Sequence, residues 1–110
     1  MPELDERRRA RRLIASLTVA LWEGAAHYVV DTQNVSDAGL CLSPEKVFPV
    51  GTQLHFVFGR PPELPPVSAE GIVRWSEDGK GVGVEFTSIS ADDHQALLRF
   101  VSSQSHREEG

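Results

Sequence analysis

Two short stretches of this sequence carry residues that could bind a ligand. The first is Arg7-Arg8-Arg9-Ala10-Arg11-Arg12, where five arginines fall within six positions. A guanidinium group pairs bidentately with phosphate or with the O6 and N7 edge of guanine, and it also stacks on a base. The second is Asn34-Val35-Ser36-Asp37-Ala38-Gly39, whose Asn and Ser side chains are typical of turns. Together they indicate a site for an anionic, planar ligand, although a plain turn beside a solvated charged tail would also fit.

The second stretch must be placed by its neighbours. Residues 27–33 before it have the composition of a strand, and Leu40-Cys41-Leu42 follows it as an apolar strand. The hexapeptide is therefore predicted to be a tight link between two strands. Gly39 is expected either to have a positive φ or to allow a close approach by another group.

With these two stretches in this order, the sequence resembles the PilZ family, the small bacterial domains that bind cyclic di-GMP. The family motifs are Arg-x-x-x-Arg near the N-terminus and Asp/Asn-x-Ser-x-x-Gly after the second strand. The first motif fits two registers here, Arg8 with Arg12 or Arg7 with Arg11. We prefer Arg8 and Arg12, because the first apolar strand position then follows at the family's usual spacing, at Leu17.

The resemblance implies a role for each matching residue. Arg8 and Arg12 would take guanine edges and phosphates, Asn34 and Ser36 would hydrogen-bond a guanine, and Gly39 would leave room for its plane. The implied function is a non-catalytic receptor that binds cyclic di-GMP and signals to an unidentified downstream protein. The alternative is a PilZ-fold adaptor that binds another protein and no nucleotide.

Arg7 bears on how many ligand molecules bind. It stands directly before the preferred motif pair. In the family, an arginine at that position tends to accompany a stacked pair of cyclic di-GMP molecules, and an apolar residue there tends to accompany one. The resemblance therefore leads us to expect two ligand molecules per chain.

Composition limits the other possibilities. The 110 residues are 40% hydrophobic and 25% charged, which is typical of one globular domain with a modest core. The net charge is −5, although five of the eleven Lys and Arg residues lie at positions 7–12. Because the rest of the chain is strongly acidic, it would repel a phosphate backbone, so we expect no DNA or RNA binding.

Cellular location follows from similarly simple observations. The single Cys41 excludes an internal disulfide and is typical of a reducing cytoplasm. No apolar run is long enough to span a membrane, and no signal peptide opens the chain, so membrane insertion is not expected. We therefore expect a cytoplasmic protein, in which Cys41 is a small core residue.

The ligand-binding stretches must be held by a scaffold of short strands. Apolar alternation predicts strands over 17–21, 27–33, 40–42, 53–58, 67–75 and 82–86, with a proline-rich loop over 59–66. A capped helix is predicted from Ser90 to Val101. The expected fold is all-β with a C-terminal helix, a small six-stranded antiparallel β-barrel, because closure would remove exposed strand edges. Residues 1–12 and 102–110 are expected to be flexible tails around a 13–101 domain.

Residues for catalysis or metal binding do not stand out. The four histidines are scattered without metal-ligand spacing, and Asp92 and Asp93 have the position of helix-capping residues. Trp75 could stack on a base, but its strand alternation favours the core or the rim of the barrel. We therefore predict no enzyme activity, no catalytic residue, no metal site and no cofactor.

Overall fold

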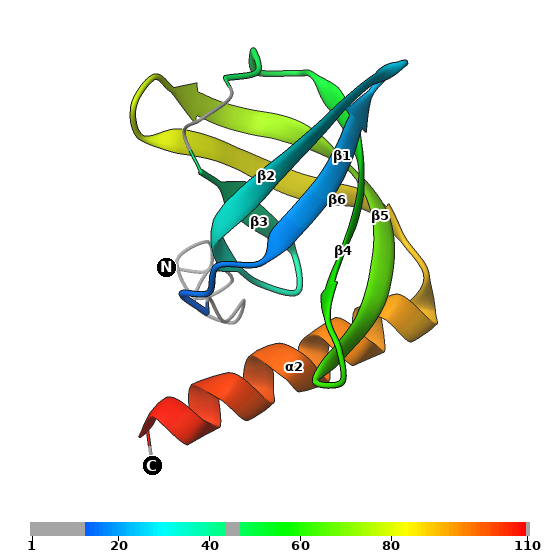
Figure 1. The fold of residues 1–110 in the computed structure, drawn as a ribbon, viewed down its shortest axis with the longest axis vertical. Coiled ribbons are helices and arrows are strands. Elements are labelled where there is room, and N and C mark those ends of the chain that lie inside the picture. The colour runs from blue at the N-terminus through cyan, green and yellow to red at the C-terminus, as the bar shows by residue number, and fades with distance from the viewer. Residues whose placement is uncertain (1–12, 44–46, 110) are drawn as a thin grey trace, which may run out of the picture.

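The computed structural model describes residues 13–43 and 47–109. These residues form antiparallel strands that close into a barrel in the order β1-β2-β3-β6-β5-β4 (Figure 1). The strands are β1 (Thr18–Glu23), β2 (Ala26–Val35), β3 (Gly39–Leu42), β4 (Gln53–Arg60), β5 (Leu64–Glu77) and β6 (Gly81–Ile89). Helix α2 (Ala91–Glu109) follows them, so the predicted six-stranded antiparallel barrel with a C-terminal helix is confirmed.

The core forms because apolar side chains alternate along each strand. Val19 and Leu21 on β1 are fully buried, as is Phe56 on β4, whereas the residues next to them in sequence are half-buried or exposed. A two-residue period places every second side chain on one face of a strand. Closing the sheet gathers these faces inside the barrel and pairs every strand on both sides.

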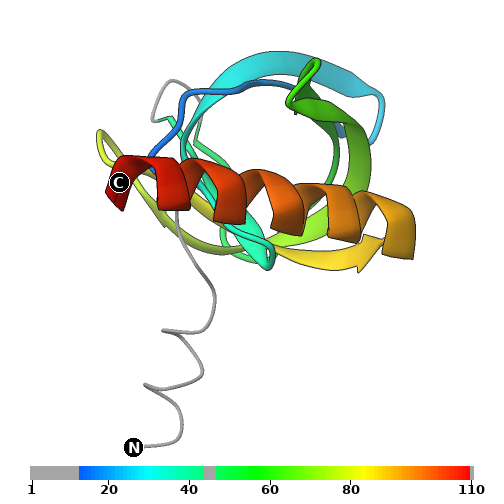
Figure 2. The same cartoon turned by 90° about the horizontal axis from the view of Figure 1, so that it is seen from below.

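Helix α2 covers one end of the barrel. It begins after Ser90, whose hydroxyl accepts a hydrogen bond from the Asp93 backbone N–H at 3.1 Å. Leu97, Phe100 and Val101 recur at helical spacing and are at most 2% exposed. Figure 2 shows the helix lying across the opening, so its apolar stripe completes the core there.

The helix and one strand pair run further than the sequence predicted. Helix α2 continues to Glu109, past the Val101 boundary of the predicted domain, because residues 102–109 contain neither proline nor glycine to end it. The expected loop over 59–66 is instead the tip of the β4–β5 hairpin, where Arg60 pairs with Leu64. Pro65 and Pro66 fit in β5 because β6 begins to pair with that strand only at Ala69.

Trp75 is not in the core, which was one of the two positions that the sequence prediction allowed. A β-bulge lies between Val73 and Trp75, so Trp75 rather than Arg74 pairs opposite Gly83 on β6. One extra residue reverses the facing of those that follow it. The side chain is 44% exposed, and its indole lies directly against Gly83, where a β-carbon would overlap it.

Candidate functional site

The link between β2 and β3 is shorter than the hexapeptide, because Asn34 and Val35 belong to β2 and Gly39 begins β3. Ser36 organises this link. Its Oγ accepts hydrogen bonds from the backbone N–H groups of Ala38 at 3.1 Å and Gly39 at 3.2 Å. Its own N–H donates to the Gly39 carbonyl at 2.8 Å, and the whole residue is only 1% exposed. Ser36 therefore holds the backbone of the turn in one conformation.

We expect Ser36→Ala to destabilise the domain. The substitution leaves two N–H groups of a buried turn without their acceptor, which costs about 1–3 kcal/mol. Cyclic dinucleotide binding should weaken as well if the turn is part of a ligand site. Urea unfolding of Ser36→Ala beside Ser88→Ala, an exposed serine on β6, measures the first effect. Equal midpoints for the two variants would contradict the structural role of the Ser36 hydroxyl.

Gly39 is required because another strand approaches it closely, which is one of the two reasons that the sequence suggested. It is not among the glycines with positive φ, which are Gly24, Gly51, Gly79 and Gly81. A β-carbon at Gly39 would overlap the backbone carbonyl of Val84 on the neighbouring strand β6. The group that approaches Gly39 closely is therefore the backbone of strand β6. The expectation of a positive φ is wrong, and the space that Gly39 leaves is filled by protein.

Asn34 lies where β2 changes its pairing. Thr32 pairs with Leu42 and Asn34 with Cys41, so Gln33 is the additional residue of a β-bulge. A bulge re-aims the side chains that follow it, and bulges are common beside functional sites. Asn34 is half-buried in this position, two residues before Ser36. The bulge and the serine turn thus place Asn34 and Ser36 at the same end of β2.

Residues 13–17 run beside β2 before β1 begins. Leu13 and Val35 exchange both backbone hydrogen bonds, at 2.8 and 2.9 Å, and form an isolated antiparallel bridge. Leu13 is also buried, at 3% exposure. Because Leu13 directly follows Arg12 in the sequence, the chain enters the barrel beside the residue between Asn34 and Ser36. The residue that follows the arginine-rich stretch in the sequence is thus paired within the Asn34–Gly39 motif.

Of the predicted ligand-binding residues, three arginines lie outside the described part of the chain: Arg7, Arg8 and Arg12. The structure brings together the other three, Asn34, Ser36 and Gly39, within one bulge and turn. Five arginines at positions 7–12 precede a body that carries most of the acidic residues. In the sequence, the five arginines end directly before Leu13, the residue that pairs with Val35.

Thr32 holds the 13–17 segment, and sequence reasoning missed it. Its hydroxyl donates to the Ala15 carbonyl at 2.6 Å and accepts from the Leu17 N–H at 2.9 Å. Thr32 is 3% exposed, so neither bond is replaced easily by water. Thr32 could have been recognised from the alternation along β2, because it lies two residues after Val30 and faces the interior as Val30 does.

Asp37 connects the turn to the helix, which the sequence also did not indicate. The Asp37 carboxylate lies 3.5 Å from Nε2 of His94 on the first turn of α2. Both side chains are partly exposed, at 26% and 37%, so the pair is a modest contact when His94 is protonated. The turn is also fixed to β6, because Phe86 donates its N–H to the Ala38 carbonyl at 2.9 Å.

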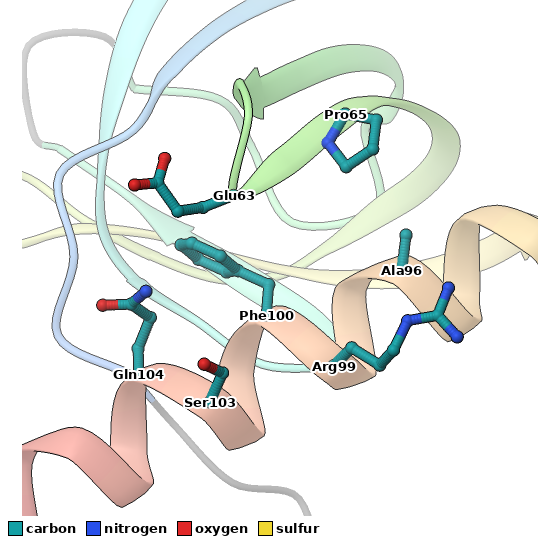
Figure 3. A pocket seen from close by; sticks show the side chains of 7 residues that line it. All are labelled: Glu63, Pro65, Ala96, Arg99, Phe100, Ser103 and Gln104. Atoms are coloured by element: carbon teal, nitrogen blue, oxygen red, sulfur yellow. The ribbon is translucent and has the colours of Figure 1, made fainter.

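Three other observations complete the search for sites in the described residues. A hollow of about 440 Å³ lies between the β4–β5 hairpin and α2. Figure 3 shows the side chains that line it, among them Glu63, Arg99 and Phe100. The hollow contains none of the motif residues. Across residues 13–43 and 47–109 there is no group of His, Cys, Asp or Glu side chains that could hold a metal ion. Over the same ranges no helix combines the length and the apolar character that a membrane crossing requires.

One family model matches most of the chain, and solved structures share its fold. The sequence model of the PilZ domain matches residues 6–103. Among solved structures, the motility inhibitor MotI/DgrA of Bacillus subtilis superposes with a TM-score of 0.83 at 23% identity, over 94% of this chain and 54% of that one. This chain thus spans about half the length of that protein. A search of curated proteins gave no match.

Two further structures show the same fold. The PilZ domain of CeSA from a cellulose-synthesizing bacterium has a TM-score of 0.65 at 15% identity, with 88% of this chain and 100% of that one covered. The PilZ domain of YcgR from Escherichia coli, solved with c-di-GMP, has a TM-score of 0.69 at 16% identity. That match covers 94% of this chain and 96% of the other.

Proposed function

Since this chain belongs to the PilZ domain family, we propose that it is a non-catalytic receptor for cyclic di-GMP. The observation that supports the proposal best is the pairing of Leu13 with Val35, because it ties the end of the arginine-rich stretch to the Asn34–Gly39 motif. A ligand that needs both stretches would then meet them at one place. The receptor would act in the cytoplasm, as expected from its single cysteine.

The proposed contacts divide between the two stretches. Arg8 and Arg12 bind phosphates and guanine edges, for which a planar guanidinium is suited. Asn34 hydrogen-bonds a guanine from the barrel side, while Ser36 and Gly39 shape the turn that presents it. A direct bond from Ser36 to guanine stays a prediction, since its hydroxyl would have to give up a bond within the turn.

The experiment that tests the proposal is a calorimetric titration of the full chain with cyclic di-GMP. We expect saturable binding that weakens as the salt concentration rises, because exposed charges are screened by salt. Absence of binding by the folded chain would exclude the receptor function. That result would favour the alternative function, a PilZ-fold adaptor that binds another protein and no nucleotide.

Specificity is the next expected outcome. Cyclic di-GMP should bind at least about 30-fold more tightly than cyclic di-AMP, because adenine offers an N6 donor where guanine offers the O6 acceptor. An arginine fork then loses one of its two bonds, at roughly 1–3 kcal/mol per base, and the ligand has two bases. Competition between the two cyclic dinucleotides measures the ratio. Equal affinities would contradict guanine recognition.

The downstream response needs a path from the ligand to a partner. We infer that α2 is part of this path, because Asp37 in the motif turn contacts His94 on the helix. A ligand that shifts the turn would change this contact and the packing of the helix end. The partner itself is an unidentified protein.

A further inference from the structure

The outer face of β1 carries an aromatic group that the cyclic di-GMP proposal does not use. Trp22 stacks on His27 of β2, with ring centroids 4.8 Å apart and planes 23° apart. On its other neighbour, β4, it meets His55 at 5.7 Å with a tilt of 52°. These residues are paired across the strands, Trp22 with His27 and with His55. They form a continuous row on the outside of the barrel.

A hollow of about 320 Å³ opens beside this row, and we call it the Trp22 hollow. Its lining includes Trp22, Gln53, His55, Glu70 and Thr87. This volume is at the lower end of the range for ligand sites, so it suits one side chain rather than a dinucleotide. No Lys or Arg is among the lining residues.

Glu70 is the charged group of the Trp22 hollow. It lies opposite His55 in the β4–β5 pairing. Two other carboxylates of β5 and β6 have cationic partners, Glu77 with Lys80 at 3.2 Å and Glu85 with Arg74 at 2.6 Å. Within residues 13–43 and 47–109, Glu70 has no ion pair, so its carboxylate is available to a cation from outside.

The next outward-facing row beside the Trp22 row is apolar across β2, β1 and β4. Val29 on β2 is 62% exposed, and in the next row of pairs it lies opposite Ala20 on β1, which pairs with Val57 on β4. An apolar patch beside an aromatic residue and a charged rim is typical of a protein interface. Val29 and Asn34 are five positions apart on β2, or roughly 16 Å at about 3.3 Å per residue. The patch is therefore well separated from the proposed ligand site.

We propose that the Trp22 hollow and the adjoining Val29 surface bind a partner protein through an arginine flanked by apolar residues. A guanidinium matches this site in two ways, because it stacks on an indole and pairs bidentately with a carboxylate. Glu70 supplies that carboxylate, Gln53 and Thr87 offer further acceptors, and Val29 receives the flanking apolar side chains. The acidic body attracts such a partner from a distance. This inference stands independently of cyclic di-GMP binding.

The test uses the full chain without nucleotide and two synthetic octapeptides. One has a single arginine flanked by leucines, and the other has citrulline, which is uncharged, in its place. Binding is followed by NMR through the indole N–H signals, with Trp75 as an internal control on β5. We expect the arginine peptide to shift the Trp22 signal saturably and the citrulline peptide to bind at least fivefold more weakly. The Trp75 signal should stay in place.

Single-residue variants test whether the arginine peptide binds at the Trp22 hollow or is attracted generally to the acidic surface. Glu70→Gln should weaken the arginine peptide at least fivefold, whereas Glu77→Gln, a carboxylate already paired with Lys80, should leave its binding unchanged. Trp22→Leu should abolish the binding, and circular dichroism checks that each variant is folded. Equal binding of the two peptides, equal effects of Glu70→Gln and Glu77→Gln, or shifts that never saturate would each overturn the proposal.

Discussion

Replacing Arg8 or Arg12 with alanine is expected to lower the affinity for cyclic di-GMP by about 100-fold or more. A hydrogen bond to a charged group contributes roughly 1.5–3 kcal/mol, and a bidentate pair contains two. About 1.4 kcal/mol corresponds to a tenfold change in the dissociation constant. Calorimetric titration at fixed ionic strength measures the loss. The melting temperature should stay unchanged, because the apolar core lies within residues 13–101.

The neighbouring arginines provide matched controls for charge alone. Arg9→Ala removes the same charge from the same stretch and should reduce affinity only slightly, through weaker attraction at low salt. Arg7→Ala should mainly lower the number of ligands bound at saturation from two towards one. Two ligands bring four phosphates and four guanines, which is more than two arginines can serve. If Arg7→Ala and Arg11→Ala are instead the inactive pair, our register is wrong by one residue.

The barrel was predictable because its information is local. Alternation of apolar residues marks each strand directly, as in Leu54, Phe56 and Phe58 on β4, and the serine cap marks the start of α2. Bulges were not predictable, since they depend on which strand pairs where. The bulge at Gln33 and the one before Trp75 both change the direction of side chains that the simple alternation had assigned.

The candidate site shows the same division between local and distant information. The motif residues Asn34, Ser36 and Gly39 were found from their types and spacing. What holds them was not found, because the hydroxyl of Thr32 acts on residues 15 and 17, and Asp37 meets His94 more than fifty positions away. The sequence also gave no sign that the group close to Gly39 is strand β6.

Gly39→Ala is expected to destabilise the fold itself, before any effect on ligand binding. The added β-carbon would overlap the backbone carbonyl of Val84, and a backbone group in a paired strand cannot rotate away as a side chain can. We expect a loss of roughly 3 kcal/mol or more in the free energy of unfolding, at the upper end of the cost of overpacking. This is a large part of the stability of a small domain. Urea unfolding followed by circular dichroism measures it.

Gly24→Ala is the matched comparison, because a β-carbon there meets nothing within 4 Å and only its positive φ of 59° opposes the change. We expect that variant to lose about 1 kcal/mol, the cost of a left-handed backbone for an L-residue. The difference between the two variants isolates the contact of β3 with β6. If Gly39→Ala is as stable as the parent chain but no longer binds cyclic di-GMP, Gly39 leaves room for the ligand plane. In that case the strand contact is not what requires glycine at this position.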